Sequence, residues 1–120
     1  MAAKLTTDLW LAEINKMREY LGEQPLASDK NGEIDLEGSE GPIRPEVIYS
    51  MKNGVGIRRT FEYSPHNGDI YDRNTEEMTC KDLTKLLTNL TKETRRRVRL
   101  KVKEELENEA IQKRMDELGF

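Results

Sequence analysis

The residues with the most distinctive chemistry form a basic run in the last third of the chain. Within residues 95–103 stand four arginines and two lysines: Arg95, Arg96, Arg97, Arg99, Lys101 and Lys103. Guanidinium groups bind phosphate and carboxylate oxygens through paired hydrogen bonds, and ammonium groups bind them as point charges. We therefore identify these six residues as the candidate partner-binding residues, with either an acidic protein surface or a nucleic-acid backbone as the ligand.

Two features of the sequence favour a protein ligand over nucleic acid. The chain carries a net charge of −3, and the basic run passes directly into an acidic run that begins at Glu104. Those glutamates would repel the phosphates that the arginines attract. Aromatic side chains for stacking on bases are absent between Tyr71 and Phe120. The sequence predicts a small non-enzymatic interaction protein, an adaptor or an inhibitor, with a nucleic-acid-binding module that uses residues 95–103 as the alternative.

The other chemically active residue types are too few to predict catalysis. His66, the only histidine, lies in a turn and has no second histidine with which to hold zinc, and Cys80 is the only cysteine. Acidic residues alternate from Asp29 onward like calcium ligands, but Ile34 occupies the sixth loop position, where a calcium loop needs glycine. We expect no enzyme activity, no catalytic residues, no metal and no cofactor.

Length and composition predict one domain with a thin core. The chain has 120 residues, of which 36% are charged and 35% are hydrophobic, so most side chains must face solvent. A single cysteine fits a reducing compartment. No apolar run approaches the roughly 18 residues that a membrane-spanning helix needs. We expect a cytoplasmic protein without membrane contact, folded as a single domain over residues 1–120.

The first predicted element is an amphipathic helix near the N-terminus. Its apolar residues recur with helical spacing at Trp10, Ile14, Met17 and Leu21. Thr6 or Thr7 provides an N-cap, and Gly22 stands where a helix C-cap is expected. Residues 23–41 are rich in glycine and acidic residues, which predicts an acidic flexible loop with a hairpin turn at the Asn-Gly pair 31–32.

The middle of the chain has the composition of β-strands, because β-branched and aromatic residues are enriched there. A strand over 47–51, a turn at 52–54 and a strand over 55–63 predict a hairpin. A turn at 64–68 then returns the chain as a shorter strand over 69–73. The predicted fold class is α+β, with an N-terminal helix, a three-stranded antiparallel meander and a C-terminal helical segment of two helices.

The C-terminal segment is predicted to contain a helix break. Thr79 caps a helix whose apolar stripe consists of Leu83, Leu86, Leu87 and Leu90. If this helix continued, the same face would carry Thr94, Arg97 and Lys101, which cannot be buried beside leucines without partners. The pattern therefore predicts that the helix ends between Asn89 and Thr94 and that a second helix follows.

The basic run itself fits two secondary structures. As a helix, its cations pair with glutamates four residues away, at Glu93/Arg97, Lys101/Glu105 and Lys103/Glu107. As a short strand over residues 97–103, valine and leucine alternate with arginine and lysine. The helix accounts for more residues, and from Glu104 onward helix alone is predicted. Pairing of this C-terminal helix between two chains would bury Ile111, Met115 and Leu118 in a homodimer.

Overall fold

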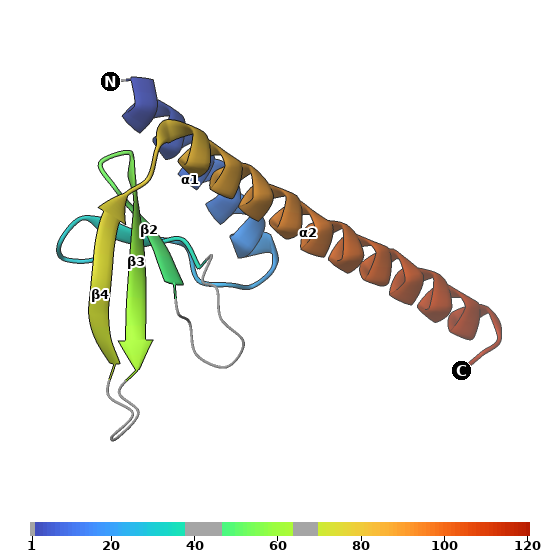
Figure 1. Cartoon of the computed structure of the whole chain (residues 1–120). Helices are drawn as coiled ribbons and strands as arrows, with labels where there is room; N and C mark the ends of the chain where they lie inside the picture. The colour runs from blue at the N-terminus through green and yellow to red at the C-terminus, as the bar shows by residue number, and fades with distance from the viewer. Residues whose placement is uncertain (1, 38–46, 64–69) are drawn as a thin grey trace.

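The computed structural model describes residues 2–37, 47–63 and 70–120 of the chain. The fold is α+β (Figure 1), with the elements α1 (Ala2–Tyr20), β1 (Glu33–Asp35), β2 (Val47–Lys52), β3 (Val55–Tyr63), β4 (Ile70–Glu77) and α2 (Cys80–Glu117). The predicted fold class is therefore confirmed at the level of α+β. Two details were wrong, because the sheet has four strands instead of three and a single helix replaces the two C-terminal helices.

The strands form one antiparallel sheet in the order β1-β2-β3-β4. The predicted hairpin is present, since Lys52 pairs with Val55 across a two-residue turn of Asn53 and Gly54. Both turn residues have positive φ, 52° and 79°, which is the backbone that an Asn-Gly pair adopts most readily and that matches the twist of the strands. Strand β4 extends to Glu77, beyond the predicted end at residue 73.

The additional strand, β1, arises within the range predicted as an acidic loop, of which residues 38–41 lie outside the described part of the chain. The Asn-Gly pair 31–32 forms a turn, which the bridge between Ser28 and Ile34 closes. Asp29 accepts hydrogen bonds at its carboxylate from two backbone amides of this turn. Leu36, directly after β1, has only 1% of its surface exposed. The segment is therefore anchored to the sheet by an apolar residue despite its acidic composition.

The core lies between the sheet and the first half of α2. It consists of Leu36, Met51, Leu83 and Leu87, with Trp10, Ile34, Tyr49, Leu86 and Leu90 packed around them. Gly56 of β3 makes this contact possible, because a Cβ at that position would lie 3.0 Å from Leu83 Cδ1. The predicted leucine stripe thus packs on the sheet, and the chain's only tryptophan lies at the edge of the core.

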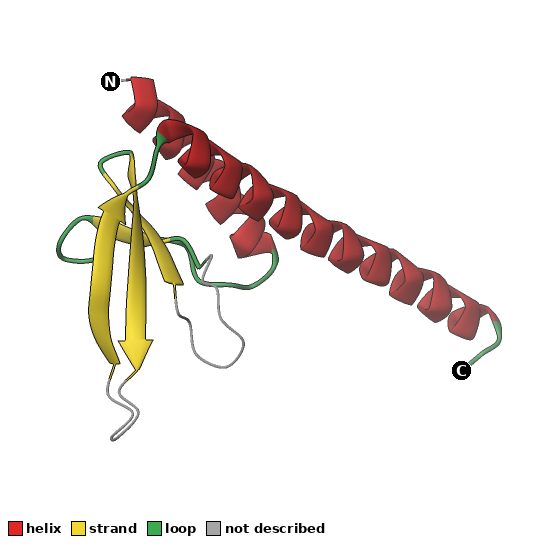
Figure 2. Cartoon of the chain, viewed as in Figure 1, coloured by secondary structure: helices red, strands yellow, loops and turns green. Residues whose placement is uncertain are grey.

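The predicted break between Asn89 and Thr94 is wrong, because α2 runs unbroken through this region (Figure 2). The polar side chains on its inner face all find partners. Thr94, 5% exposed, donates its hydroxyl hydrogen to the Leu90 carbonyl at 2.8 Å. Thr91 accepts a hydrogen bond of 2.8 Å from Trp10 Nε1. A polar group with a hydrogen bond can be buried at little cost, so the helix has no reason to end.

Helix α1 packs alongside α2 in the same direction. Trp10 contacts Thr91, Glu13 contacts Arg95 and Tyr20 contacts Glu105, so the contacting positions rise together along both helices. Helix α1 starts at Ala2, ahead of the predicted caps Thr6 and Thr7. Its end agrees with the prediction, because Gly22 has φ 76° and the Glu23 amide donates to the Arg18 carbonyl, as in a Schellman motif.

The length of α2 gives the molecule its elongated shape, 63 × 45 × 26 Å. A helix of 38 residues spans about 57 Å, whereas α1 ends beside Lys101 and Glu105. The remainder of α2 projects away from the sheet and from α1 (Figure 1). We call residues 106–118, the part of α2 beyond its contacts with α1 together with the C-cap residue Leu118, the α2 arm.

Candidate protein interface on the C-terminal helix

The predicted binding residues lie on α2, which excludes the strand alternative for residues 97–103. Arg95 lies 2.6 Å from a carboxylate oxygen of Glu13 in α1, and Arg96 lies 2.6 Å from one of Glu93 in α2. All four side chains are more than half exposed, so water and salt screen both pairs. The hydrogen bond from Arg96 lowers the pKa of Glu93, as expected for a carboxylate stabilised in its charged form.

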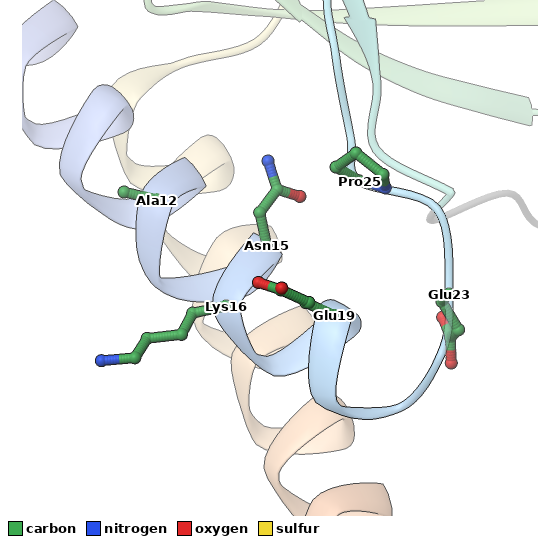
Figure 3. A pocket seen from close by; sticks show the side chains of 6 residues that line it. All are labelled: Ala12, Asn15, Lys16, Glu19, Glu23 and Pro25. Atoms are coloured by element: carbon green, nitrogen blue, oxygen red, sulfur yellow. The ribbon is translucent and has the colours of Figure 1, made fainter.

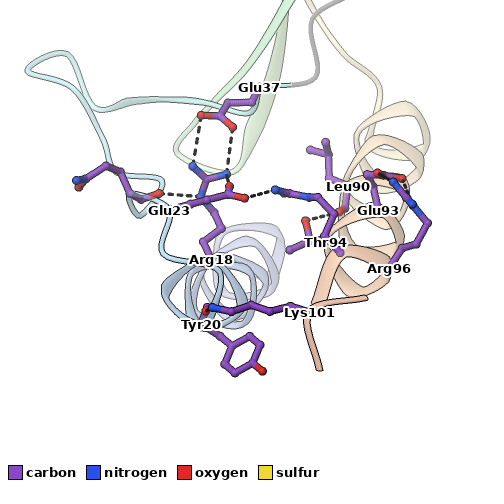
Figure 4. Close-up of polar contacts among 11 residues, drawn as sticks. Arg18, Tyr20, Glu23, Glu37, Leu90, Glu93, Thr94, Arg96 and Lys101 are labelled. Atoms are coloured by element: carbon purple, nitrogen blue, oxygen red, sulfur yellow. Dashed lines mark hydrogen bonds and ion pairs between the residues drawn. The ribbon is translucent and has the colours of Figure 1, made fainter. Parts of the chain in front are cut away.

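Arg97 belongs to a cluster that joins α1, α2 and the segments before and after β1. It pairs with Glu23, which also lies 3.0 Å from Arg18 Nη1. Arg18 is 8% exposed. Its Nε donates to the Gln24 carbonyl at 2.8 Å, and Nη1 lies 3.1 Å from Glu37. Figure 4 shows the side chains of Glu23 and Glu37 converging on Arg18. Arg97 is therefore paired within the protein, where its contact with Glu23 helps to hold α2 against the segment that follows α1.

Lys101 is also engaged by α1. Its ammonium group donates to the backbone carbonyl of Tyr20 and lies 4.6 Å from the centre of the Tyr20 ring. The Tyr20 hydroxyl donates to Glu105 at 2.6 Å, and this hydrogen bond to a carboxylate raises the pKa of the Tyr20 phenol. The end of α1 is therefore fixed to α2 by one cation and one acceptor on successive turns.

The two remaining candidate residues, Arg99 and Lys103, have the fewest contacts with other side chains in the described chain. Lys103 is 74% exposed at its side chain and lies 3.9 Å from Glu107, a loose pair at the predicted i,i+4 spacing. Arg99 is exposed and makes no hydrogen bond or ion pair with the residues that the structure describes. The basic run is thus not a continuous cationic surface, because glutamates from three parts of the chain neutralise most of it.

The α2 arm has a different character, since it is exposed on every side. Each residue from 102 to the end of the chain is exposed, including the apolar side chains Leu106, Ile111, Met115 and Leu118, which are 61%, 57%, 41% and 52% exposed. Within the described residues, side-chain pairs between neighbouring turns, such as Gln112 with Asp116 at 2.8 Å, are its support. Such pairs stabilise an isolated helix only slightly.

The depression between α1 and the following segment has no catalytic arrangement (Figure 3). It has a volume of about 530 Å³ and is lined by Ala12, Asn15, Lys16, Glu19, Glu23 and Pro25. Asn15 is fully used by the fold, because its amide nitrogen donates to the Leu26 carbonyl at 2.9 Å and its oxygen accepts from the Leu26 amide at 2.7 Å. The lining holds no nucleophile beside a base.

A second charged cluster lies in the sheet. Glu33 of β1 accepts hydrogen bonds from Arg59 of β3 and from Ser50 of β2. The hydrogen bond from Arg59 is the main reason that the pKa of Glu33 is lowered, with Ser50 adding to it. Ser50 is only 3% exposed. These residues satisfy one another and join three strands, so we assign them a structural role.

No group of three or more metal-ligating side chains occurs in the described residues. Cys80 is exposed at the start of α2, and His66, the other residue considered for catalysis, lies outside the described part of the chain. Within the helices of the described ranges, none is both long and apolar enough to cross a membrane. Comparison with protein-family models, with curated proteins and with solved structures finds no match to this chain.

Proposed function

We propose that the protein is a small non-enzymatic interaction protein, an adaptor or an inhibitor, that binds another protein through the α2 arm. The observation that carries this proposal is the exposure of Leu106, Ile111, Met115 and Leu118 on the α2 arm, where every residue is exposed. Burying each of these side chains would contribute about 1–2 kcal/mol. A partner surface is the simplest source of that burial.

The charge pattern supports a protein partner over nucleic acid. Glutamates hold Arg95, Arg96 and Arg97, and breaking these pairs would offset any gain from binding phosphate. The α2 arm that follows is acidic and would repel a nucleic-acid backbone. Within the basic run, Arg99 and Lys103 are the cations with most freedom to meet carboxylates of a partner.

The test is a pull-down from native lysate with the wild type and two matched variants. In the double variant Ile111→Glu/Leu118→Glu the α2 arm loses two apolar side chains, and Leu9→Glu replaces an equally exposed leucine (65%) on α1. We expect the double variant to lose the captured protein and the Leu9 variant to retain it. Equal capture by all three proteins would refute a role for the arm.

Nucleic-acid binding is tested in the same preparation by adding nuclease and by a gel-shift assay at two salt concentrations. We expect capture to survive nuclease and no shift to appear. A salt-sensitive shift that Arg96→Glu/Arg99→Glu abolishes would instead support the nucleic-acid-binding alternative.

A further inference from the structure

Six residues on the outer side of α2 form a row with spacings of four and three: Leu100, Glu104, Glu107, Ile111, Arg114 and Leu118. This spacing is that of the inward-facing residues of a coiled coil. We call this row the seam. Its three apolar members are all more than half exposed, at 53%, 57% and 52%, and none of its residues is occupied by the sheet or by α1.

The seam lies on the side of α2 opposite α1. Thr91, Arg95, Lys101 and Glu105 contact α1. At roughly 3.6 residues per turn, Thr91, Arg95 and Glu105 lie about half a turn from the seam and Lys101 lies about a quarter turn from it. Because α1 ends beside Lys101 and Glu105, a helix that lay along the seam from Leu100 to Leu118 would meet neither α1 nor the sheet. The seam is therefore accessible along its whole length.

We infer that the seam binds the seam of a second copy of this chain, with the two helices antiparallel; this inference rests on the proposed function and names the partner. In this arrangement Leu100 of one copy faces Leu118 of the other, and Glu104 faces Arg114. Ile111 faces Glu107 at the centre, where the glutamate stem covers the isoleucine and its carboxylate reaches solvent. Two apolar layers thus close the ends of the interface.

Charge decides the direction of pairing. A parallel pair in register would place Glu104 against Glu104, Glu107 against Glu107 and Arg114 against Arg114, so that three of the six layers would repel. In the antiparallel pair, each Glu104 instead faces Arg114 of the other copy and each Glu107 faces Ile111, so that none of the six layers brings like charges together. Among the described residues Arg114 pairs with Glu117 alone, at 3.2 Å, with side chains 69% and 53% exposed. Exchanging this exposed pair for one with Glu104 of the second copy costs little.

The antiparallel direction also keeps the sheets of the two copies apart. Each sheet lies at the opposite end of the helix pair, because Leu118 of the second copy lies at the level of Leu100 in the first. With three apolar side chains per chain in the seam, we expect a weak dimer with a dissociation constant in the micromolar range.

The test is sedimentation equilibrium of the full chain over a concentration range that spans this value. Glu104→Arg and Arg114→Glu should each weaken the dimer about tenfold or more, because each creates two like-charge contacts per dimer. An equimolar mixture of the two single variants should dimerise at least as tightly as wild type, since both contacts then pair arginine with glutamate. Glu109→Arg, on the opposite side of the arm, is the matched control and should stay within twofold of wild type.

A wild-type chain that stays monomeric would overturn the inference, and so would a mixture of variants that associates no better than either variant alone. Far-UV circular dichroism confirms that the variants keep their helix, so that loss of association cannot reflect unfolding. Failure here is distinguishable from failure of the proposed function. If the chain is monomeric but Ile111→Glu/Leu118→Glu still loses a captured protein, the seam binds a different chain and only the self-pairing is wrong.

Discussion

Replacing Arg18 by methionine should destabilise the protein by about 2 kcal/mol, an estimate that follows from the three groups its side chain holds. The side chain is 9% exposed and is held by Glu23 at 3.0 Å, Glu37 at 3.1 Å and the Gln24 carbonyl at 2.8 Å. Hydrogen bonds to a charged group contribute about 1.5–3 kcal/mol when buried. Glu23 and Glu37 are 30% and 58% exposed, so water recovers part of what these carboxylates lose.

Methionine preserves most of the volume and leaves the apolar contacts of the arginine stem in place, which isolates the polar contribution. The measurement is urea denaturation followed by the fluorescence of Trp10 and by far-UV circular dichroism, with the slope of the free energy against urea unchanged. Arg96→Met is the control, because Arg96 has an exposed pair with Glu93 on the same helix and lies outside the seam. We expect this control to stay within about 0.5 kcal/mol of wild type.

A change of less than about 0.5 kcal/mol for Arg18→Met would refute the reasoning, because it would mean that the cluster joining α1 to β1 and α2 adds nothing measurable. A double-mutant cycle with Arg97→Met sharpens the test. Since Glu23 contacts both arginines, the two substitutions should not be additive. Strict additivity would show that the shared glutamate does not couple the two helices.

Three further substitutions test other parts of the fold. Glu33→Gln should reduce the stability of the protein at neutral pH, because Arg59 lowers the pKa of Glu33 in the folded protein. The stability that the Glu33 carboxylate contributes is present above the ordinary carboxyl pKa and is lost as the pH falls through the lowered pKa. The wild type and the variant should therefore converge in acid-denaturation curves. Leu36→Ala, at a position 1% exposed, should cost about 3 kcal/mol in urea denaturation, and a cost below about 1 kcal/mol would contradict its place in the core. Thr91→Val should cost about 1 kcal/mol by removing one of the acceptors of Trp10 Nε1, and an unchanged midpoint would show that this hydrogen bond is not formed in solution.

The features that the sequence predicts correctly are governed by neighbouring residues. The β2–β3 turn follows from the backbone preferences of Asn53 and Gly54. The start of α2 follows from Thr79, which accepts a hydrogen bond from the Asp82 amide as expected of an N-cap. The end of α2 has a local cause of the same kind, because Gly119 beside it has a φ of 81°, which suits glycine. In each case the energetic cause lies within a few residues of its effect.

The wrong predictions concern groups whose partners lie far away in the sequence. The break in α2 was expected because Thr94 and Arg97 appeared to have no partners beside the leucines. Arg97 finds Glu23 at a separation of 74 residues, which no local pattern can reveal. Strand β1 was missed for a related reason. Two of its three residues are acidic, and only pairing with β2 makes the segment a strand.

The candidate binding residues illustrate the same division. The i,i+4 pattern favoured a helix over the strand alternative and predicted the pair between Lys103 and Glu107. It also predicted a pair between Glu93 and Arg97, but Arg97 pairs with Glu23 instead. The pair of Arg95 with Glu13 was not, because α1 and α2 are brought together only by the complete fold. The identity of the partner stays a prediction, since it depends on surfaces outside this chain.

The parallel packing of α1 on α2 also constrains the order in which the protein can fold. Trp10 and Thr91 are 81 residues apart, and the whole sheet lies between them in the chain. During synthesis α1 emerges before the sheet and before the part of α2 that covers its apolar stripe. The β2–β3 hairpin and the start of α2 depend on contacts closer in sequence and so form at a lower loop-closure cost. We therefore expect α1 to dock late in folding and Trp10 to stay exposed to solvent until it does, which time-resolved tryptophan fluorescence during refolding would check.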